Sequence, residues 1–499
     1  MRKKRLLLNT TTSWIYEVLA IISSLILPRL FLSYYGSELN GLMQSITQFL
    51  SIISFLQFGI GAVIQASLYK PLVDKNNEEI SKVISSGEKF FKKIGLVLLV
   101  YASGLMLFYP IITQGTYGFG DVFLLVFAIS LGLFVQYYFG LVDILLLVAD
   151  QKGYVNYIGS IVTVVINTAV SALLICAGWS IQAVKLVSAV IFLIKPVFNR
   201  IYVNQHYVIN RKITYNTEPI KQKWNGVAQH VSTVVLDNTD TLVLTVFSTL
   251  SNVSIYGIYH MVIYGVKTMF TSVANGVEAV LGELWARNDN NELNKVFGFT
   301  EWGINNAVIL LFGCTEMLII PFVMLYTKGI TDANYYQPLF ATLMVMAHAF
   351  HCLRLPYHMM IKASGKFKET QSNYLIAAII NLLISIFAVK RCGLIGVAIG
   401  TLVAMVYQTV WMAVFNVRHL GVMQINQFLK QMIFDLLAVV ILTVIVNQLP
   451  LQFDTVFHWI FSAAIVFVVD VLVLIGLNLL FYKEKSFLLI KKVKVRVQK

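Results

Sequence analysis

The sequence predicts an all-α polytopic membrane protein of about 14 transmembrane helices, with two six-helix lobes forming a parallel repeat and two further C-terminal helices. Hydrophobic residues make up 58% of the 499 residues and charged residues only 12%, whereas about a quarter of the residues of a soluble protein are charged. The hydrophobic residues gather in runs of about 20 residues, which is the length that spans a bilayer. Short segments also recur at a fixed separation. A soluble globular fold is therefore excluded.

Each predicted helix is an apolar stretch long enough to cross the hydrocarbon core. In chain order the stretches are 12–33, 40–66, 93–113, 122–148, 155–177, 180–199, 225–247, 252–276, 300–326, 336–361, 372–389, 393–416, 430–448 and 455–482. Two runs, 241–266 and 392–417, contain no Asp, Glu, Lys or Arg. The first stretch contains Glu17 and Arg29 and lacks a small-residue cleavage site, so we expect it to remain as the first helix.

The Lys and Arg residues predict the orientation of these helices, because cytoplasmic loops retain cations. With the amino terminus inside, 31 of the 38 Lys and Arg residues fall in cytoplasmic segments. Six of them lie between Lys195 and Lys223, and adding or dropping one earlier helix would place this loop outside. Both termini are therefore expected to be cytoplasmic, and no soluble domain interrupts the spans.

Two pairs of polar segments indicate the internal repeat. Residues 75–83 (KNNEEISKV) and 288–296 (NDNNELNKV) share four of nine residues at a separation of 213. Ala149-x-x-Lys152 and Ala363-x-x-Lys366 match at a separation of 214. We therefore predict an N-terminal lobe over 1–222, a C-terminal lobe over 223–420, and an appended helix pair with a basic tail over 421–499. Two such lobes around a midplane site are typical of secondary transporters.

Several short stretches are motif-like. They are Gly59-x-Gly61 followed by LYKPL at 68–72, ADQK at 149–152 and DNTD at 237–240. With the helix count and repeat, they resemble the Wzx-type polysaccharide flippases of the multidrug/oligosaccharidyl-lipid/polysaccharide exporter superfamily. The resemblance implies a multi-pass protein of the bacterial plasma (inner) membrane. It also implies alternating access that flips an undecaprenyl-pyrophosphate-linked oligosaccharide to the outer leaflet, for capsule, exopolysaccharide or O-antigen-type assembly. Its implied partners are this lipid-linked oligosaccharide, membrane lipids and a polysaccharide polymerase.

Three cations fall inside predicted helices, where a charge is costly and usually faces a cavity or a partner. They are Arg29, Lys267 and Arg354, and we interpret them as substrate-binding residues because arginine and lysine both bind pyrophosphate oxygens. Lipid II flippases use arginines on the corresponding first and eighth helices, which extends the resemblance to Arg29 and Lys267; lysine at 267 departs from that pattern. Alternatively, Arg29 snorkels to the interface and the other two pair with nearby acids.

Acidic residues in the spans are candidates for coupling transport to Na⁺ or H⁺. Asp237 and Asp240 lie three residues apart, hence on one helical face, and Glu17 lies in the first helix. Such groups bind Na⁺ or take up a proton when they are buried close together. The alternative is a structural role as partners of Lys267 or Arg354.

Polar residues on the tenth predicted helix follow a helical spacing. His348, His351, Arg354 and His358 are separated by three, three and four residues. They suggest either a proton-sensitive lining or polar packing beside a cavity. No spacing specifies a metal site, and we expect no cofactor.

Other classes of function fit less well. Catalytic motifs such as G-x-S-x-G, H-E-x-x-H and the P-loop do not occur, so no catalytic residue is predicted. The net charge of +14 is spread over loops and does not form the basic surface that binds nucleic acid. Two alternatives remain, namely a cation-coupled multidrug exporter and a polytopic polysaccharide polymerase or ligase.

Overall fold

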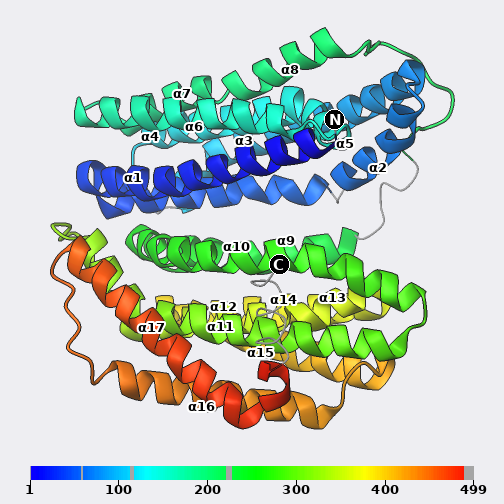
Figure 1. Ribbon diagram of the computed structural model, residues 1–499. Helices are drawn as coiled ribbons and strands as arrows, with labels where there is room; N and C mark the ends of the chain where they lie inside the picture. Colours follow the sequence, from blue (N-terminus) through cyan, green and yellow to red (C-terminus); the bar gives the residue numbers. More distant parts are fainter. Residues whose placement is uncertain (1, 58–59, 113–116, 221–226, 488–499) are drawn as a thin grey trace. The chain divides into compact units, whose positions relative to one another are not determined.

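A computed structural model describes residues 2–57, 60–112, 117–220 and 227–487, and the regular elements within these ranges are all helices (Figure 1). The chain forms two compact units, Met1–Ser254 and Ile255–Lys499, which we call unit 1 and unit 2. The predicted fold class is confirmed. The lobe boundary after residue 222 rests on the sequence repeat and stays a prediction.

Unit 1 contains the first nine α-helices, together with one 3-10 and one π segment. These are α1 (Arg2–Ser51), η1 (Ile52–Gln57), α2 (Ile60–Val73), α3 (Asn77–Ile112), α4 (Phe119–Val135), η2 (Gln136–Gly140), α5 (Leu141–Ala149), α6 (Gly153–Cys176), α7 (Ile181–Ile191), α8 (Ile194–His206) and α9 (Val227–Phe247). The next helix, α10 (Leu250–Ala286), begins in unit 1 and continues into unit 2.

Unit 2 contains the remaining helices. These are α11 (Asn290–Tyr326), α12 (Pro338–Leu353), α13 (Leu355–Ala363), α14 (Phe367–Cys392), α15 (Leu394–Phe415), the π segment η3 (Asn416–Leu420), α16 (Ile425–Val446) and α17 (Val456–Phe481).

Within the described residues every predicted span overlaps helical structure, whereas residues 58–59, 113 and 225–226 of three predicted spans lie outside the described residues. Eleven helical stretches of the described residues are long and apolar enough to cross a membrane. One of them, which contains α1, covers the predicted span 12–33 and most of 40–66, because the two helical halves of α1 are joined at a kink where Gly36 has non-helical backbone angles (φ 80°, ψ 174°). The predicted spans 225–247 and 252–276 correspond to α9 and α10.

Several helices extend beyond the predicted apolar stretches. Helix α3 begins at Asn77, whereas the apolar stretch begins at residue 93. The additional residues are polar and contain Glu78 and Glu79 in the first turn, where carboxylates favour the positive end of the helix dipole. A search for apolar runs misses such extensions because they need not lie in lipid.

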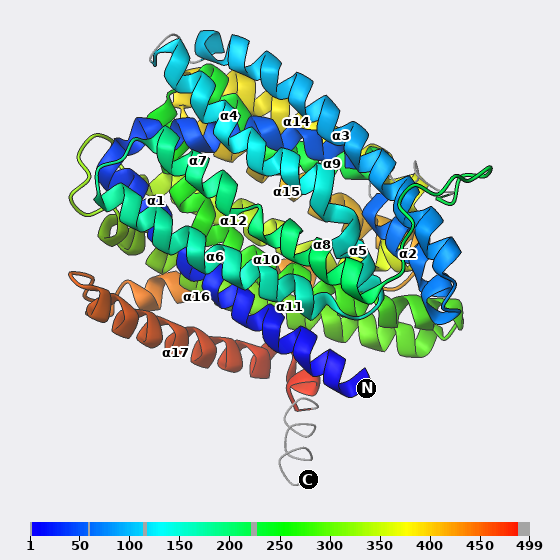
Figure 2. The same cartoon turned by 90° about the horizontal axis from the view of Figure 1, so that it is seen from above.

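Within unit 1, α1 and α6 pack side by side in both views (Figures 1 and 2). Within unit 2, α14 and α15 form a tight hairpin. A Cβ atom on Gly396 of α15 would lie 2.5 Å from the backbone carbon of Ala388 on α14. Only glycine therefore allows this approach between the two helices.

The internal repeat is visible in the backbone. Lys75 and Asn288, which start the matched segments, both have positive φ, at 51° and 55°; this is uncommon for residues other than glycine. The side chains of the following Asn76 and Asp289 each accept a hydrogen bond of 3.1 Å from the backbone N–H three residues later. The two turns therefore share their backbone conformation and their helix cap.

The second pair of turns agrees in the same way. Gln151 (φ 58°) and Gly365 (φ 71°) occupy the matched positive-φ positions. The following Lys152 and Lys366 donate their N–H groups to carbonyls five residues earlier, on Leu147 and Ile361. The same offset of 214 relates donors and acceptors alike, so both lobes close this turn with the same hydrogen bond.

Candidate substrate-binding site

An interrupted helix places an arginine inside a membrane span of unit 2. Helices α12 and α13 form one span, Pro338–Ala363, and the interruption lies at Arg354. Pro356 explains the interruption, because proline has no N–H to donate and its ring crowds the carbonyl one turn earlier. The Thr409 hydroxyl on α15 donates a 3.0 Å hydrogen bond to the Phe350 carbonyl, so a side chain of another helix bonds to the backbone beside the break.

Arg354 is held by neutral polar partners on two helices. Only 5% of Arg354 is exposed. One guanidinium nitrogen donates to the Gln408 side chain on α15, and the other lies 3.1 Å from Nδ1 of His351 on α12. These contacts fix the planar guanidinium in a buried position.

Lys267 on α10 belongs to the same group of side chains. It is 7% exposed, and it interacts electrostatically with His348 and His351, which are both 8% exposed. The rings of His260, two turns earlier on α10, and His348 lie 5.7 Å apart. We call Lys267, His348, His351, Arg354 and Gln408 the cationic cluster. The sequence indicated Lys267 and Arg354 as intramembrane cations and the two histidines by their helical spacing, whereas Gln408 is identified only by the fold.

The cationic cluster contains polar atoms that the described residues do not satisfy. Nε2 of Gln408 and Nε2 of His348 are buried and have no hydrogen-bond partner in the described part of the chain. Leaving a buried donor unsatisfied costs about 1–3 kcal/mol, and such atoms in native structures usually mark a bound water or ligand. Two cations and an unsatisfied amide donor favour a ligand rich in acceptor oxygens.

The other predicted site residues lie in unit 1. Arg29 is partly buried on α1, directly after Pro28, and its carbonyl accepts a 2.9 Å hydrogen bond from Ser33. Glu17 is exposed on α1, and Asp240 on α9 is 3% exposed. The side chain of Asp237 lies outside the described part of the chain. In the described residues, no group of three or more His, Cys, Asp or Glu side chains is arranged to hold a metal ion.

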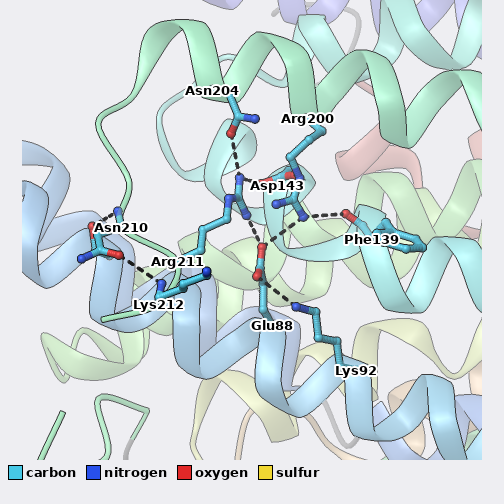
Figure 3. Close-up of polar contacts among 10 residues, drawn as sticks. Glu88, Lys92, Phe139, Asp143, Arg200, Asn204, Asn210, Arg211 and Lys212 are labelled. Atoms are coloured by element: carbon cyan, nitrogen blue, oxygen red, sulfur yellow. Dashed lines mark hydrogen bonds and ion pairs between the residues drawn. The ribbon is translucent and has the colours of Figure 1, made fainter. Parts of the chain in front are cut away.

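Sequence reasoning missed a buried ion-pair network in unit 1 (Figure 3). Arg200 on α8 contacts Glu88 on α3 at 3.0 Å and Asp143 on α5 at 2.7 Å. Arg211, in the segment after α8, contacts Asp143 at 2.9 Å and also pairs with Glu88. Lys92 approaches Glu88 at 3.6 Å. The network fastens the segment after α8 to α3 and α5 and lies beside α8 itself.

Nothing in the local sequence signals this network, because its members come from four separate segments. The loop counts treat Arg200 and Arg211 only as cytoplasmic cations. Each carboxylate is contacted by both arginines, and such mutual pairing is typical of a structural anchor rather than of an anion-binding site.

Comparison with known proteins gives matches in structure alone. No family model matches the chain, and no curated protein matches it. The structure of "Lipid II flippase MurJ, inward closed conformation" has a TM-score of 0.66 at 15% identity and covers 96% of this chain and 99% of its own. An inward-facing multidrug resistance MATE family transporter of the MOP superfamily has a TM-score of 0.56 at 11% identity, covering 80% of this chain and 93% of its own.

A third match is the eukaryotic MATE transporter AtDTX14, with a TM-score of 0.57 at 11% identity over 83% of this chain and 96% of its own. Identities this low establish the fold and leave the substrate open. The chain is therefore a multi-pass membrane protein with the fold shared by a lipid II flippase and the MATE transporters of the MOP superfamily.

Proposed function

We propose that the protein flips a pyrophosphate-linked lipid oligosaccharide from the inner to the outer leaflet of a bacterial plasma membrane by alternating access. The observation that carries this proposal is the buried cationic cluster, with Lys267 in the predicted span 252–276 on α10 and Arg354 in the span Pro338–Ala363. The fold supports the proposal as well, because the similarity to the lipid II flippase structure extends over 96% of the chain. The Wzx-type assignment, with its capsule or exopolysaccharide product, belongs to this proposal.

The chemistry of the cluster suits a pyrophosphate. The negative charge of a pyrophosphate is spread over several oxygens. Some of these oxygens can accept hydrogen bonds from the planar guanidinium of Arg354 while others contact the ammonium group of Lys267. The amide of Gln408 supplies a further donor. In a medium of low dielectric constant each such contact is stronger than in water, which offsets part of the cost of removing the headgroup from solvent.

A cation-coupled drug exporter is the second candidate, because MATE transporters share the fold. The cationic cluster argues against a cationic drug in unit 2, since like charges repel one another in a buried site. The two candidates therefore make opposite predictions for the loss of positive charge.

The decisive experiment compares variants in a strain that lacks its own copy of the protein, at matched membrane levels. We expect Arg29→Ala and Lys267→Ala each to abolish surface polysaccharide, while Lys267→Arg retains much of it because charge dominates there. Arg287→Ala is the matched control, since Arg287 directly follows α10 and its exposed side chain pairs with Glu283 on that helix.

The same experiment identifies the alternatives. Normal export by the Arg29→Ala, Lys267→Ala double variant would exclude the cationic mechanism. Export of a cationic dye by the wild type, increased in the Lys267→Ala variant, would support the drug exporter instead.

We infer that Asp237, Asp240 and Glu17 are candidates for coupling the transport to Na⁺ or H⁺. Asp240 supports this inference because it is only 3% exposed on α9, where a carboxylate needs a cation or a proton to offset burial. We expect Asp237→Asn and Asp240→Asn to reduce flipping in proteoliposomes and to change its dependence on Na⁺ or pH. Normal flipping with only a lower folding yield would show that these carboxylates are structural.

A further inference from the structure

Two carboxyl groups, on Glu301 and Asp435, lie beside Tyr357 where α11, α13 and α16 meet in unit 2. Glu301 on α11 is 6% exposed, and its Oε1 accepts a 2.7 Å hydrogen bond from the Tyr357 hydroxyl on α13. Asp435 on α16 accepts a 2.7 Å hydrogen bond from the side-chain amide of Gln431, one turn earlier. The two carboxyl groups interact electrostatically.

Neither carboxyl group has an ion-pair partner. In the described part of the chain, no Lys, Arg or His nitrogen lies within 4.0 Å of Glu301 or Asp435. The cation that acts on Glu301 from a greater distance is Lys485. Glu301 is buried and Asp435 is partly buried, and holding ionised carboxylates at such positions without a contacting cation is costly. The pair therefore needs either a bound cation or a proton.

A second observation points to a small ligand at the same place. Asn305, one turn after Glu301 on α11, is 2% exposed, and its Oδ1 has no hydrogen-bond partner among the described residues. Asn305 and Asp435 line one cavity of about 10 Å³, together with Tyr357, Thr409 and Gln431. This is about the least space that holds one water molecule, and a water or hydronium there could donate to Asn305.

A much larger cavity leads to the pair from the surface of unit 2. It has a volume of about 1000 Å³ and lies among the start of α11, the start of α16 and the segment after α17. Glu301 and Gln431 both line it, and Gln431 lines the small cavity too. The Gln431 side chain thus separates the two spaces, accepting from the Tyr482 hydroxyl at 2.7 Å while donating to Asp435.

From these contacts we propose that Glu301 and Asp435 share one exchangeable proton, delivered through the larger cavity. A hydronium ion in the cavity transfers its proton to a carboxylate oxygen and leaves water behind; release reverses the step. The small cavity beside Asn305 holds the water that connects the proton to Asp435.

Other titratable groups around the pair fit this assignment. Tyr357 faces it from α13, Lys430 from α16, and Tyr482 and Lys485 from the segment after α17. Lys430 and Lys485 lie 4.7 and 5.5 Å from the centre of the Tyr482 ring, and each donates to a backbone carbonyl. Burial lowers the pKa of Lys485. Among the described contacts, neither lysine pairs directly with Glu301 or Asp435.

The shared proton goes beyond the proposed function. Only its role in transport rests on that function. Helices α16 and α17 would then belong to the energy-coupling apparatus and not only to the periphery of unit 2. The protonation itself can be measured without any substrate, so failure of the flippase proposal leaves this test intact.

The test is infrared difference spectroscopy of the full-length protein in lipid nanodiscs at neutral pH, transferred from H₂O to D₂O in a potassium buffer. We expect the wild type to show a protonated carboxylic acid band that shifts promptly in D₂O. Asp435→Asn and Glu301→Gln should each lose this prompt component, because one carboxylate alone no longer repels a neighbour. Asp470→Asn is the control, since Asp470 is fully buried, accepts from Cys314 and lines neither cavity.

Two outcomes would overturn the proposal. One is a prompt component that survives in both single variants, each confirmed as folded by an unchanged elution volume and melting curve. The other is loss of the component in the wild type when Na⁺ replaces K⁺, which would assign the site to a metal cation. In proteoliposomes, a pH gradient should accelerate flipping by the wild type and by Asp470→Asn but not by Asp435→Asn.

Discussion

Arg211 and Asp143 are joined by an ion pair of 2.9 Å although 68 residues separate them in the chain. Asp143 is fully buried on α5, and Arg211 lies in the irregular segment after α8. A segment without helical structure is thus tied to the helices of unit 1 by buried charge. The segment is the last described part of the chain before α9. The ion pair therefore fixes the position of the chain after the sixth predicted span.

Arg211→Gln should destabilise unit 1. Removing one partner of a buried ion pair leaves an uncompensated charge and costs about 3–5 kcal/mol; Arg200 still contacts both carboxylates, so we expect the lower end of that range. The measurement is thermal unfolding in detergent. Lys212→Gln is the control, because Lys212 is exposed, and its melting curve should match the wild type. Equal stability of both variants would contradict a role for the network as an anchor.

Tyr207 should make the protein sensitive to alkaline pH. Its hydroxyl donates to Asp150 over 2.6 Å and accepts from Lys152 over 3.0 Å. Burial, with the hydrogen bond to Asp150, raises the pKa of Tyr207. A raised pKa in the folded state means that the stabilisation is complete below the ordinary tyrosine pKa of about 10 and is lost as the pH rises above it. Melting temperatures from pH 8 to 11 should fall less steeply for Tyr207→Phe than for the wild type.

Gly396→Ala should separate α14 from α15. The added methyl group would meet backbone atoms of Ala388 at 2.5 and 2.6 Å, so a helix must move, and overpacking costs typically about 1–3 kcal/mol. Gly303→Ala on α11 is the matched control, because a Cβ there meets nothing within 4 Å and alanine favours the helix by about 1 kcal/mol. The two variants should shift the melting temperature in opposite directions; a shift of the same sign would contradict the close packing.

The orientation of the chain can be read with topology reporters. We expect a reporter after Lys223 or at Lys499 to be cytoplasmic and one within 114–120 to be external, since 31 of 38 cations assign these sides. A reporter in 200–222 that is found outside would contradict both the span count and the lobe repeat.

The membrane-spanning helices could be predicted from the sequence because each one must be apolar where it crosses the lipid. A span must be apolar over its own length, so the information is local, as in the run 392–417 that becomes α15. The positions where helices bend are harder to predict from the sequence. Pro356 indicates the break beside Arg354. The kink of α1 lies at Gly36, which has a positive φ, but a glycine in a sequence does not by itself indicate a kink.

The sites were only partly predictable, because a polar contact between helices depends on which faces meet. Helical spacing placed His348, His351 and Arg354 on one stripe, yet their neighbour Gln408 lies 54 residues from Arg354. Asp435 lies in the predicted span 430–448, and nothing in the local sequence indicates its neighbours. Its relation to Glu301 and Asn305 emerges only when α16 packs against α11.

The matched turns at Lys75 and Asn288 have a consequence for the origin of the chain. Asp74 and Arg287, just before them, also donate to carbonyls at the same offset, on Lys70 and Glu283. Four shared residues in nine are few, but a strained backbone conformation and its capping bonds persist after most side chains have changed. Duplication of one ancestral gene would leave this trace. The two turns should then be interchangeable parts, and a chimera with 288–296 in place of 75–83 should insert and fold, while a scrambled segment of the same composition should not.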